Sequence, residues 1–317
     1  MTKEIFLDRL ERPTGRVRAV LDTDAYNEID DQFALAYMLA KTEKFDVQAI
    51  TAAPFHNEKS GGPEEGMRLS YHEIKHILSL MNREDIPAFE GATSYLTDEK
   101  TPVESPAANE LVRLAKLHGQ MGPHSQNARE ADDPLYIIAI GAITNVASAL
   151  LLDPGMAERC VIVWLGGHAW PWEDTREFNM QQDVAAARVV FNSGAPVIQL
   201  PCMGVVSHLT TTGPELDYWL RGKNKISDYL AKNVSNEVSH YASGTAWSRV
   251  IWDVSAIAWF LDDSFTSGRV APGPVCEYDY TYSFDPARHD CKVIDYVNRD
   301  GIFTDMFKSL AGKGEFK

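Results

Sequence analysis

Short apolar runs alternate with longer amphipathic stretches along most of the chain. The apolar runs are four to seven residues long and often end near Gly, Pro, Asn or Asp, which is typical of buried strands. They cover residues 17–21, 47–53, 135–140, 161–165 and 197–200. Between them apolar residues return at helical spacing. Because strands and helices alternate over about 200 residues, the pattern predicts an α/β fold with a mostly parallel central sheet and helices on both faces.

The pattern changes toward the C-terminus. Residues 277–284 and 291–297 alternate in polarity and predict a small antiparallel hairpin, and residues 303–310 predict a last helix. The polar stretch 96–130 predicts either a lid or an insertion at the mouth of a site. No repeat, low-complexity run or clear linker interrupts the chain, so we expect residues 1–317 to form a single domain.

Composition limits the partners more than the fold. A hydrophobic fraction of 44% is that of a globular protein, and the formal net charge of −15 argues against nucleic acid polymers and anionic membranes. The first 14 residues contain no apolar run of signal-peptide length, and no stretch approaches the roughly 20 apolar residues of a membrane span. Four widely spaced cysteines without a CxxC pair predict free thiols. We therefore expect a cytoplasmic enzyme.

The segment after the first predicted strand carries the candidate chemistry. Five carboxylates stand within ten positions: Asp22, Asp24, Glu28, Asp30 and Asp31. An apolar helix follows directly, so the acids lie at the carboxyl edge of the sheet, where open α/β folds bind ligands. Close carboxylates repel one another, and hard oxygen ligands at this density predict a bound Ca²⁺ or Mg²⁺. We also expect Asp30 or Asp31 to cap the helix; a solvated acidic loop with such a cap is the alternative to a metal site.

The loop resembles a known family signature. Asp22-Thr-Asp24 followed by Asp30-Asp31 is similar to the aspartate motif of the inosine-uridine-preferring nucleoside hydrolases. Further matches follow in chain order over most of residues 17–261: a strand and glycine around Ile140, the motif Glu177-Phe178-Asn179, and the distal Asp253. The resemblance implies a Rossmann-like nucleoside hydrolase fold that cleaves the N-glycosidic bond of a ribonucleoside or related N-riboside. It also implies a homodimer or homotetramer.

The resemblance also implies roles for individual residues. Calcium would be held by Asp24, Asp31, Asp253 and the main-chain carbonyl of Ile140, and Asp24 would accept the proton of the attacking water. The sugar hydroxyls would be bound by Asp30, Asn57, Glu177 and Asn179. The chemistry of the last pair agrees with this role, because a carboxylate and an amide together both accept from and donate to hydroxyl groups.

Several positions depart from the family pattern. Five residues, including Glu28, separate Asp24 from Asp30, where the commonest pattern has three. Trp252 stands where well-studied members carry a histidine that is associated with protonating the departing base.

Three other polar or aromatic side chains are candidates for the missing functions. His56 and His168 each follow a predicted strand, so either could be the acid. Between Gly167 and Glu177 the family usually places another asparagine, and this sequence has none; Trp170 in this segment could stack on a base or serve packing.

Two other functions stay open at this point. A phosphohydrolase with an Asp-x-Asp nucleophile would explain Asp22 and Asp24, but it explains neither the later acids nor the Glu-Phe-Asn motif. A non-catalytic nucleoside-binding or sugar-binding protein would keep the pocket without the acid. His72 and His76 could share a metal, although a solvated helix face is the plainer interpretation.

Overall fold

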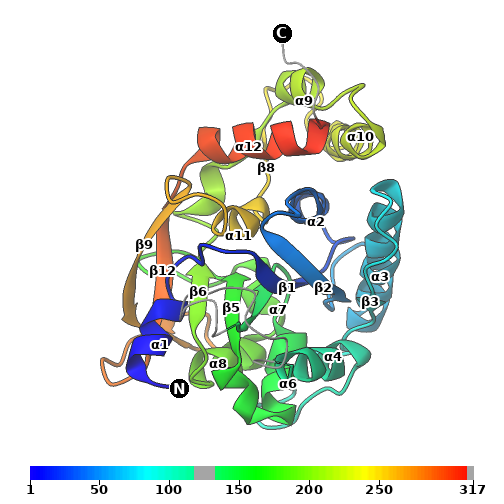
Figure 1. The fold of residues 1–317 in the computed structure, drawn as a ribbon. Coiled ribbons are helices and arrows are strands. Elements are labelled where there is room, and N and C mark those ends of the chain that lie inside the picture. Colours follow the sequence, from blue (N-terminus) through cyan, green and yellow to red (C-terminus); the bar gives the residue numbers. More distant parts are fainter. Residues whose placement is uncertain (118–132, 313–317) are drawn as a thin grey trace.

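An eight-stranded sheet forms the centre of the protein (Figure 1). In the computed structural model, which describes residues 1–117 and 133–312, its strand order is β3-β2-β1-β4-β5-β6-β12-β9. Every neighbouring pair is parallel except β12 and β9. The strands are β1 (Val17–Thr23), β2 (Phe45–Ala52), β3 (Ala88–Phe89), β4 (Leu135–Ala139), β5 (Cys160–Leu165), β6 (Val197–Leu200), β9 (Thr266–Pro272) and β12 (Asp290–Val297).

Helices cover both faces of this sheet, as Figure 1 shows. One face packs against α2 (Asp30–Ala40), α3 (Pro63–Leu80), α11 (Val254–Ala258) and α12 (Arg299–Ala311), with α9 (Gly213–Trp219) and α10 (Lys225–Ser239) beyond them. The other face packs against α4 (Pro106–Ala115), α6 (Thr144–Leu152) and α8 (Val184–Asn192). The described residues also form helices α1 (Lys3–Arg9) and α7 (Phe178–Gln182). The predicted α/β class and two covered faces are confirmed.

The strands are apolar at successive positions because helices cover both faces of the sheet. Successive side chains of a strand point to opposite faces, so a strand that is buried on both faces needs apolar residues at every position. In β5, Val161, Val163 and Leu165 join the core on one face, whereas Ile162 and Trp164 join the core on the other.

The C-terminal segment pairs differently from the prediction. A small antiparallel hairpin is present, but it consists of β10 (Val275–Cys276) and β11 (Tyr282–Ser283). Residues 290–297 instead form β12, which enters the central sheet between β6 and β9. A strand with apolar residues on both faces is stabilised inside a sheet. Of the stretch 96–130, residues 106–115 form α4, and residues 118–132 lie outside the described part of the chain.

Two observations on the described residues bear on the expectations from composition. None of the helices there is long and apolar enough to cross a membrane. All four cysteines are buried free thiols.

The strand order also fixes where a ligand can bind. From β1 the sheet grows toward β2 and β3 on one side and toward β4, β5 and β6 on the other. The connections therefore diverge between β1 and β4 and leave a crevice beyond the carboxyl ends of these two strands. Asp22 and Thr23 end β1, and Ile140 follows β4 directly, so the acidic loop opens into this crevice.

Candidate active site

A cavity of about 240 Å³ lies at the carboxyl ends of the central strands. Segments that follow β1, β4, β5 and β6 all contribute to its wall, together with the turn before α11. Eight of the residues predicted for the site line it: Asp24, Asp30, Asp31, Ile140, His168, Glu177, Asn179 and Asp253.

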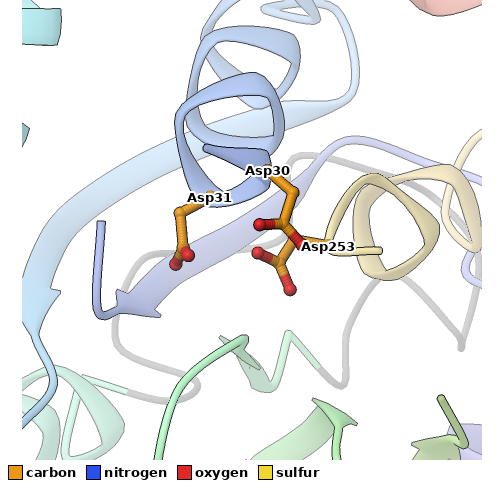
Figure 2. A group of neighbouring side chains, drawn as sticks. All are labelled: Asp30, Asp31 and Asp253. Carbon is orange, nitrogen blue, oxygen red and sulfur yellow. The ribbon is translucent and has the colours of Figure 1, made fainter. Parts of the chain in front are cut away.

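Four aspartates form what we call the floor of the cavity: Asp24, Asp30, Asp31 and Asp253. Asp30 and Asp31 belong to the first turn of α2, and Asp253 directly precedes α11. Figure 2 shows the side chains of these three residues projecting from the two helix starts toward a shared space. One carboxylate oxygen from each lies within 4.8 Å of the others, which is close enough for one cation to contact all three. Segments more than 200 positions apart thus supply one cluster.

The floor aspartates do not act as helix caps. Helix α2 begins at Asp30, and its N-cap residue is Ile29, which makes no side-chain cap bond; the capping prediction is therefore wrong. Asp253 stands at the N-cap position of α11 but makes no cap bond either. Instead Asp30 accepts a hydrogen bond from the main-chain N–H of Trp252 at 3.2 Å, and Asp31 accepts one from the hydroxyl of Thr23. The positive end of the α2 dipole still favours its two carboxylates.

The electrostatics of the floor fit a cation. The exposed fractions of Asp24, Asp30, Asp31 and Asp253 are 1 to 3%. Burial raises the pKa of Asp31 to about 7, and burial together with the neighbouring carboxylates raises the pKa values of the other three well above 3.8. Both oxygens of Asp24 are buried without a hydrogen-bond donor among the described residues. Buried charges in proteins are paired or coordinate metals, so these four side chains suit a divalent cation.

Glu28, the additional acid of the lengthened loop, has its own partner. Its carboxylate pairs with Arg249, whose guanidinium also lies 3.2 Å from Glu237. Arg249 lowers the pKa of Asp30 electrostatically, although burial outweighs this effect. The pair ties the acidic loop to the segment that carries Asp253.

The end of β4 approaches the floor closely. A Cβ atom at Gly141 would lie 2.9 Å from Oδ1 of Asp24, so only glycine leaves room for this carboxylate. The carbonyl of Ile140 accepts a hydrogen bond from Nδ2 of Asn179 at 3.1 Å, and the carbonyl of Leu165 accepts another at 3.1 Å. Asn179 therefore bridges the ends of β4 and β5 and aims its amide oxygen away from both.

Glu177 is held in place by main-chain donors. It is the N-cap of α7 and accepts hydrogen bonds from the N–H groups of Asn179 and Met180, each at 2.9 Å. The N–H of Gly167 donates a third bond at 2.8 Å. Burial nevertheless raises the pKa of this carboxyl group. The geometry fixes one carboxylate on the cavity wall beside Asn179.

His168 lines the cavity directly after the end of β5. Gly167, at φ +73°, turns the chain there, and a side chain on it would strike the hydroxyl of Tyr282. The N–H of Met203 donates to Nδ1 of His168 at 3.3 Å, so the neutral ring carries its proton on Nε2. Burial lowers the pKa of this imidazole.

Two of the predicted residues near β2 lie outside the cavity lining. The main chain of His56 is bonded to the side chain of Gln182, and its own side chain is exposed. The amide of Asn57 donates to Asn27 at 2.7 Å, and Asn27 is the residue that faces the cavity. Asn57 thus supports the wall from behind.

Trp170 also lies away from the cavity. Its indole N–H donates to Gln199 at 2.9 Å, its ring packs against Phe284, and Arg269 lies over its face. His72 and His76 are exposed on α3, and the ring of His76 packs edge-on against Tyr229.

From the sequence, no function was assigned at the cavity mouth, and Arg176 and Met203 were not named there. We call this set the rim, and it comprises Glu28, Arg176, Phe178, Met203 and Trp252. All five are partly or fully exposed. Met203 follows β6, so the sheet-edge argument that found Asp24 would have found it too. The unassigned residues Asn27, Leu165 and Cys202 complete the wall.

Comparison with known proteins extends the family match over most of the chain. Residues 19–304 match the family model described as inosine-uridine preferring nucleoside hydrolase. The pyrimidine-specific ribonucleoside hydrolase RihA of Escherichia coli K12 is 30% identical over 299 residues, which cover 86% of this chain and 87% of that protein. The chain belongs to this nucleoside hydrolase family. RihA of Klebsiella pneumoniae is 26% identical over 86% of this chain and 87% of its own length.

Solved nucleoside hydrolases share the fold at lower identity. A plant nucleoside hydrolase, the PpNRh1 enzyme, superimposes with a TM-score of 0.72 at 18% identity and covers 95% of this chain and 100% of its own. An inosine-guanosine nucleoside hydrolase gives a TM-score of 0.71 at 18% identity, over 93% of this chain and 98% of its own. Members of the family are N-glycosidases, and nothing in the comparisons supports a phosphohydrolase or a non-catalytic binding protein.

Proposed function

We propose that this nucleoside hydrolase cleaves the N-glycosidic bond of a ribonucleoside in a Ca²⁺-dependent reaction that yields free base and ribose. The observation that carries this proposal is the floor: the buried carboxylates of Asp30, Asp31 and Asp253 converge, and Asp24, which lines the same cavity, has no donor for either oxygen among the described residues. Family membership supports the reaction type. The cytoplasmic location and the homo-oligomer remain predictions.

The donors at the floor suit a hard cation. Asp24, Asp31, Asp253 and the carbonyl of Ile140 would hold calcium, which prefers carboxylate and carbonyl oxygens. Asp30 clusters with Asp31 and Asp253, but one of its oxygens already accepts the N–H of Trp252. When bound, a divalent cation lowers the pKa of a coordinated water and fixes its position.

The protein's own groups would then bind the sugar and move the proton. Asp24 would accept the proton of the attacking water. Asp30, Glu177 and Asn179 would bind the hydroxyl groups. The amide oxygen of Asn179 stays available as an acceptor because its bonds to the carbonyls of Ile140 and Leu165 both use Nδ2. The ring of carboxylates would stabilise the positive charge that develops on the sugar.

Departure of the base would depend on His168. Its proton-bearing Nε2 is the group left for the leaving base, since Nδ1 accepts the N–H of Met203. Burial lowers the pKa of this imidazole and so favours its neutral form, which donates a hydrogen bond but is a weak acid. We therefore expect good leaving bases to be cleaved fastest.

A nucleoside panel tests the proposal. Ribose release from inosine, uridine, adenosine and cytidine should occur with added calcium and stop with a chelator. Tight nucleoside binding without ribose release would refute hydrolysis, and so would phosphate release from p-nitrophenyl phosphate as the only activity.

A further inference from the structure

Arg176 stands apart from every other charged group of the cavity. Six carboxylates and this one guanidinium belong to the described lining: Asp24, Glu28, Asp30, Asp31, Glu177, Asp253 and Arg176. Its side chain is 58% exposed, so it lies at the rim. None of the functions proposed above uses it.

The fold holds this guanidinium without consuming its donors. Arg176 lies over the ring of Tyr280, 4.8 Å from the ring centre, and the carbonyl of Tyr280 accepts the N–H of Thr175 at 2.8 Å. The turn between β10 and β11 thus packs against the side chain of Arg176 and holds the main chain beside it. Asp174 is 3.9 Å away, beyond hydrogen-bond distance. Among the residues that the structure describes, the guanidinium makes no hydrogen bond, so its five N–H donors remain available.

The sugar and the base of a nucleoside would lie at different depths in the cavity. The hydroxyl groups of the sugar need the floor, where the carboxylates are 1 to 3% exposed. The base must then extend toward the rim, where Phe178, Met203 and Trp252 are half-buried and offer apolar surface to a flat ring. Arg176 belongs to the same rim and directly precedes Glu177 and Phe178 in the sequence.

We propose that Arg176 is a specificity-determining residue that selects nucleosides whose base presents a carbonyl oxygen over those that present an amino group. This inference rests on the proposed function. A guanidinium donates hydrogen bonds and accepts none, so a carbonyl oxygen pairs with it and an exocyclic amino group does not. Negative charge also develops on a carbonyl-bearing base as it leaves, so the contact strengthens in the transition state. A 5′-phosphate is the weaker partner because six carboxylates repel it.

Matched substrates isolate this interaction. Inosine and adenosine differ in the oxo or amino group at one ring position, and uridine and cytidine differ in the same way. The ratio of kcat/KM within each pair should favour the oxo base for the wild-type enzyme. Arg176→Met should reduce at least one of the two ratios by about 10- to 100-fold, since a hydrogen bond to a charged group corresponds to that factor. Arg176→Lys, which keeps a donor, should keep most of the preference.

Controls separate this proposal from its alternatives. Arg68→Met removes an equally exposed arginine that pairs with Glu64 on α3, and it should change neither ratio. The inference is overturned if Arg176→Met leaves both ratios unchanged, or if it slows inosine but not 5′-deoxyinosine, which would place the guanidinium at the 5′-hydroxyl. If the wild-type protein releases ribose from none of the four nucleosides, the proposed function itself fails.

Discussion

The floor and the rim of the cavity are built on opposite principles. The four floor aspartates come from two helix starts and one strand end, and their exposed fractions do not exceed 3%. The rim residues come from loops and from the first position of α7, and they are partly or fully exposed. Rigid elements hold reacting groups accurately, whereas exposed connections tolerate change. The comparison assigns the bond-breaking chemistry to the floor and the choice of base to the rim.

The two regions also differ in charge balance. The floor keeps carboxylates close together at a cost in stability. The charged rim residues each have an oppositely charged neighbour, because Glu28 pairs with Arg249 and Arg176 lies 3.9 Å from Asp174. Carboxylates that repel one another at short distance favour the binding of a cation between them. Substitutions at the floor should therefore affect metal binding and stability together, and those at the rim should affect neither.

The largest effect should come from removing one floor carboxylate. Asp253→Asn removes one of the three clustered carboxylates, so calcium affinity measured by calorimetry should be lost. Turnover should fall by at least about 1,000-fold. In the presence of a chelator the variant should melt at a higher temperature than the wild type, because one repulsive charge is gone.

Asp22→Asn is the matched control for this substitution. Asp22 is buried and accepts bonds from Thr51 at 2.6 Å and from Asn145 at 2.8 Å, but it does not line the cavity. Loss of the Asp22 carboxylate should reduce calcium affinity by about 10- to 100-fold.

Unchanged calcium affinity in Asp253→Asn would contradict the assignment of the floor as a calcium site.

A smaller effect is expected between floor and rim, at Asn179. Asn179→Ala removes the proposed sugar acceptor, so kcat/KM should decrease by an amount equal to roughly 2–5 kcal/mol of transition-state stabilisation. The two bonds to the carbonyls of Ile140 and Leu165 are lost as well. Denaturant unfolding should therefore show a loss of about 1–2 kcal/mol in the free energy of unfolding. If Asn179→Ala had wild-type kinetics and the lower free energy of unfolding, the role of Asn179 would be purely structural.

His168→Ala sharpens the comparison near the rim. If His168 assists the departing base, inosine should be cleaved about 100-fold more slowly, while p-nitrophenyl riboside, whose leaving group needs no proton, should change only a few-fold. His56→Ala is the matched control, since that exposed side chain lies outside the cavity lining. Equal slowing of both substrates by His168→Ala would rule out an acid role.

The smallest effect is a pH dependence of stability. Burial raises the pKa of Asp22 to about 6 and that of Asp31 to about 7, from 3.8. Between pH of about 4 and 7 the folded, metal-free protein thus binds more protons than the unfolded chain, and its free energy of unfolding falls as the pH rises, by a few kcal/mol. In chelator the melting temperature should be higher at pH 5 than at pH 8, and added calcium should raise it more at pH 8. A flat profile in chelator would contradict the repulsion at the floor.

These two regions also differ in how far the sequence predicts them. The strands and the floor follow from apolar runs and from five acids within ten positions, because both signals are local. Asp253 required a family pattern, since its carboxylate meets Asp30 and Asp31 only through the fold. From the sequence alone, the position of Asp253 directly before α11 is equally typical of a helix N-cap.

The positions of Arg176 at the rim and of Trp170 outside it could not be predicted in the same way. Arg176 is placed by a turn of the β10–β11 hairpin that lies about 100 positions away, and side-chain direction decides that Trp170 packs on Phe284 instead of facing the cavity. The pairing of β12 with β6 and β9 depends on long-range competition among strands. Such choices depend on contacts that no local pattern encodes.

Titration of calcium into the metal-free enzyme, with ribose release from inosine and uridine followed in the same samples, tests the central claim most directly. The floor predicts negligible release in chelator, recovery of activity in proportion to bound calcium, and saturation at one ion per chain. Full activity in the chelated enzyme, or calcium binding that leaves ribose release unchanged, would contradict it.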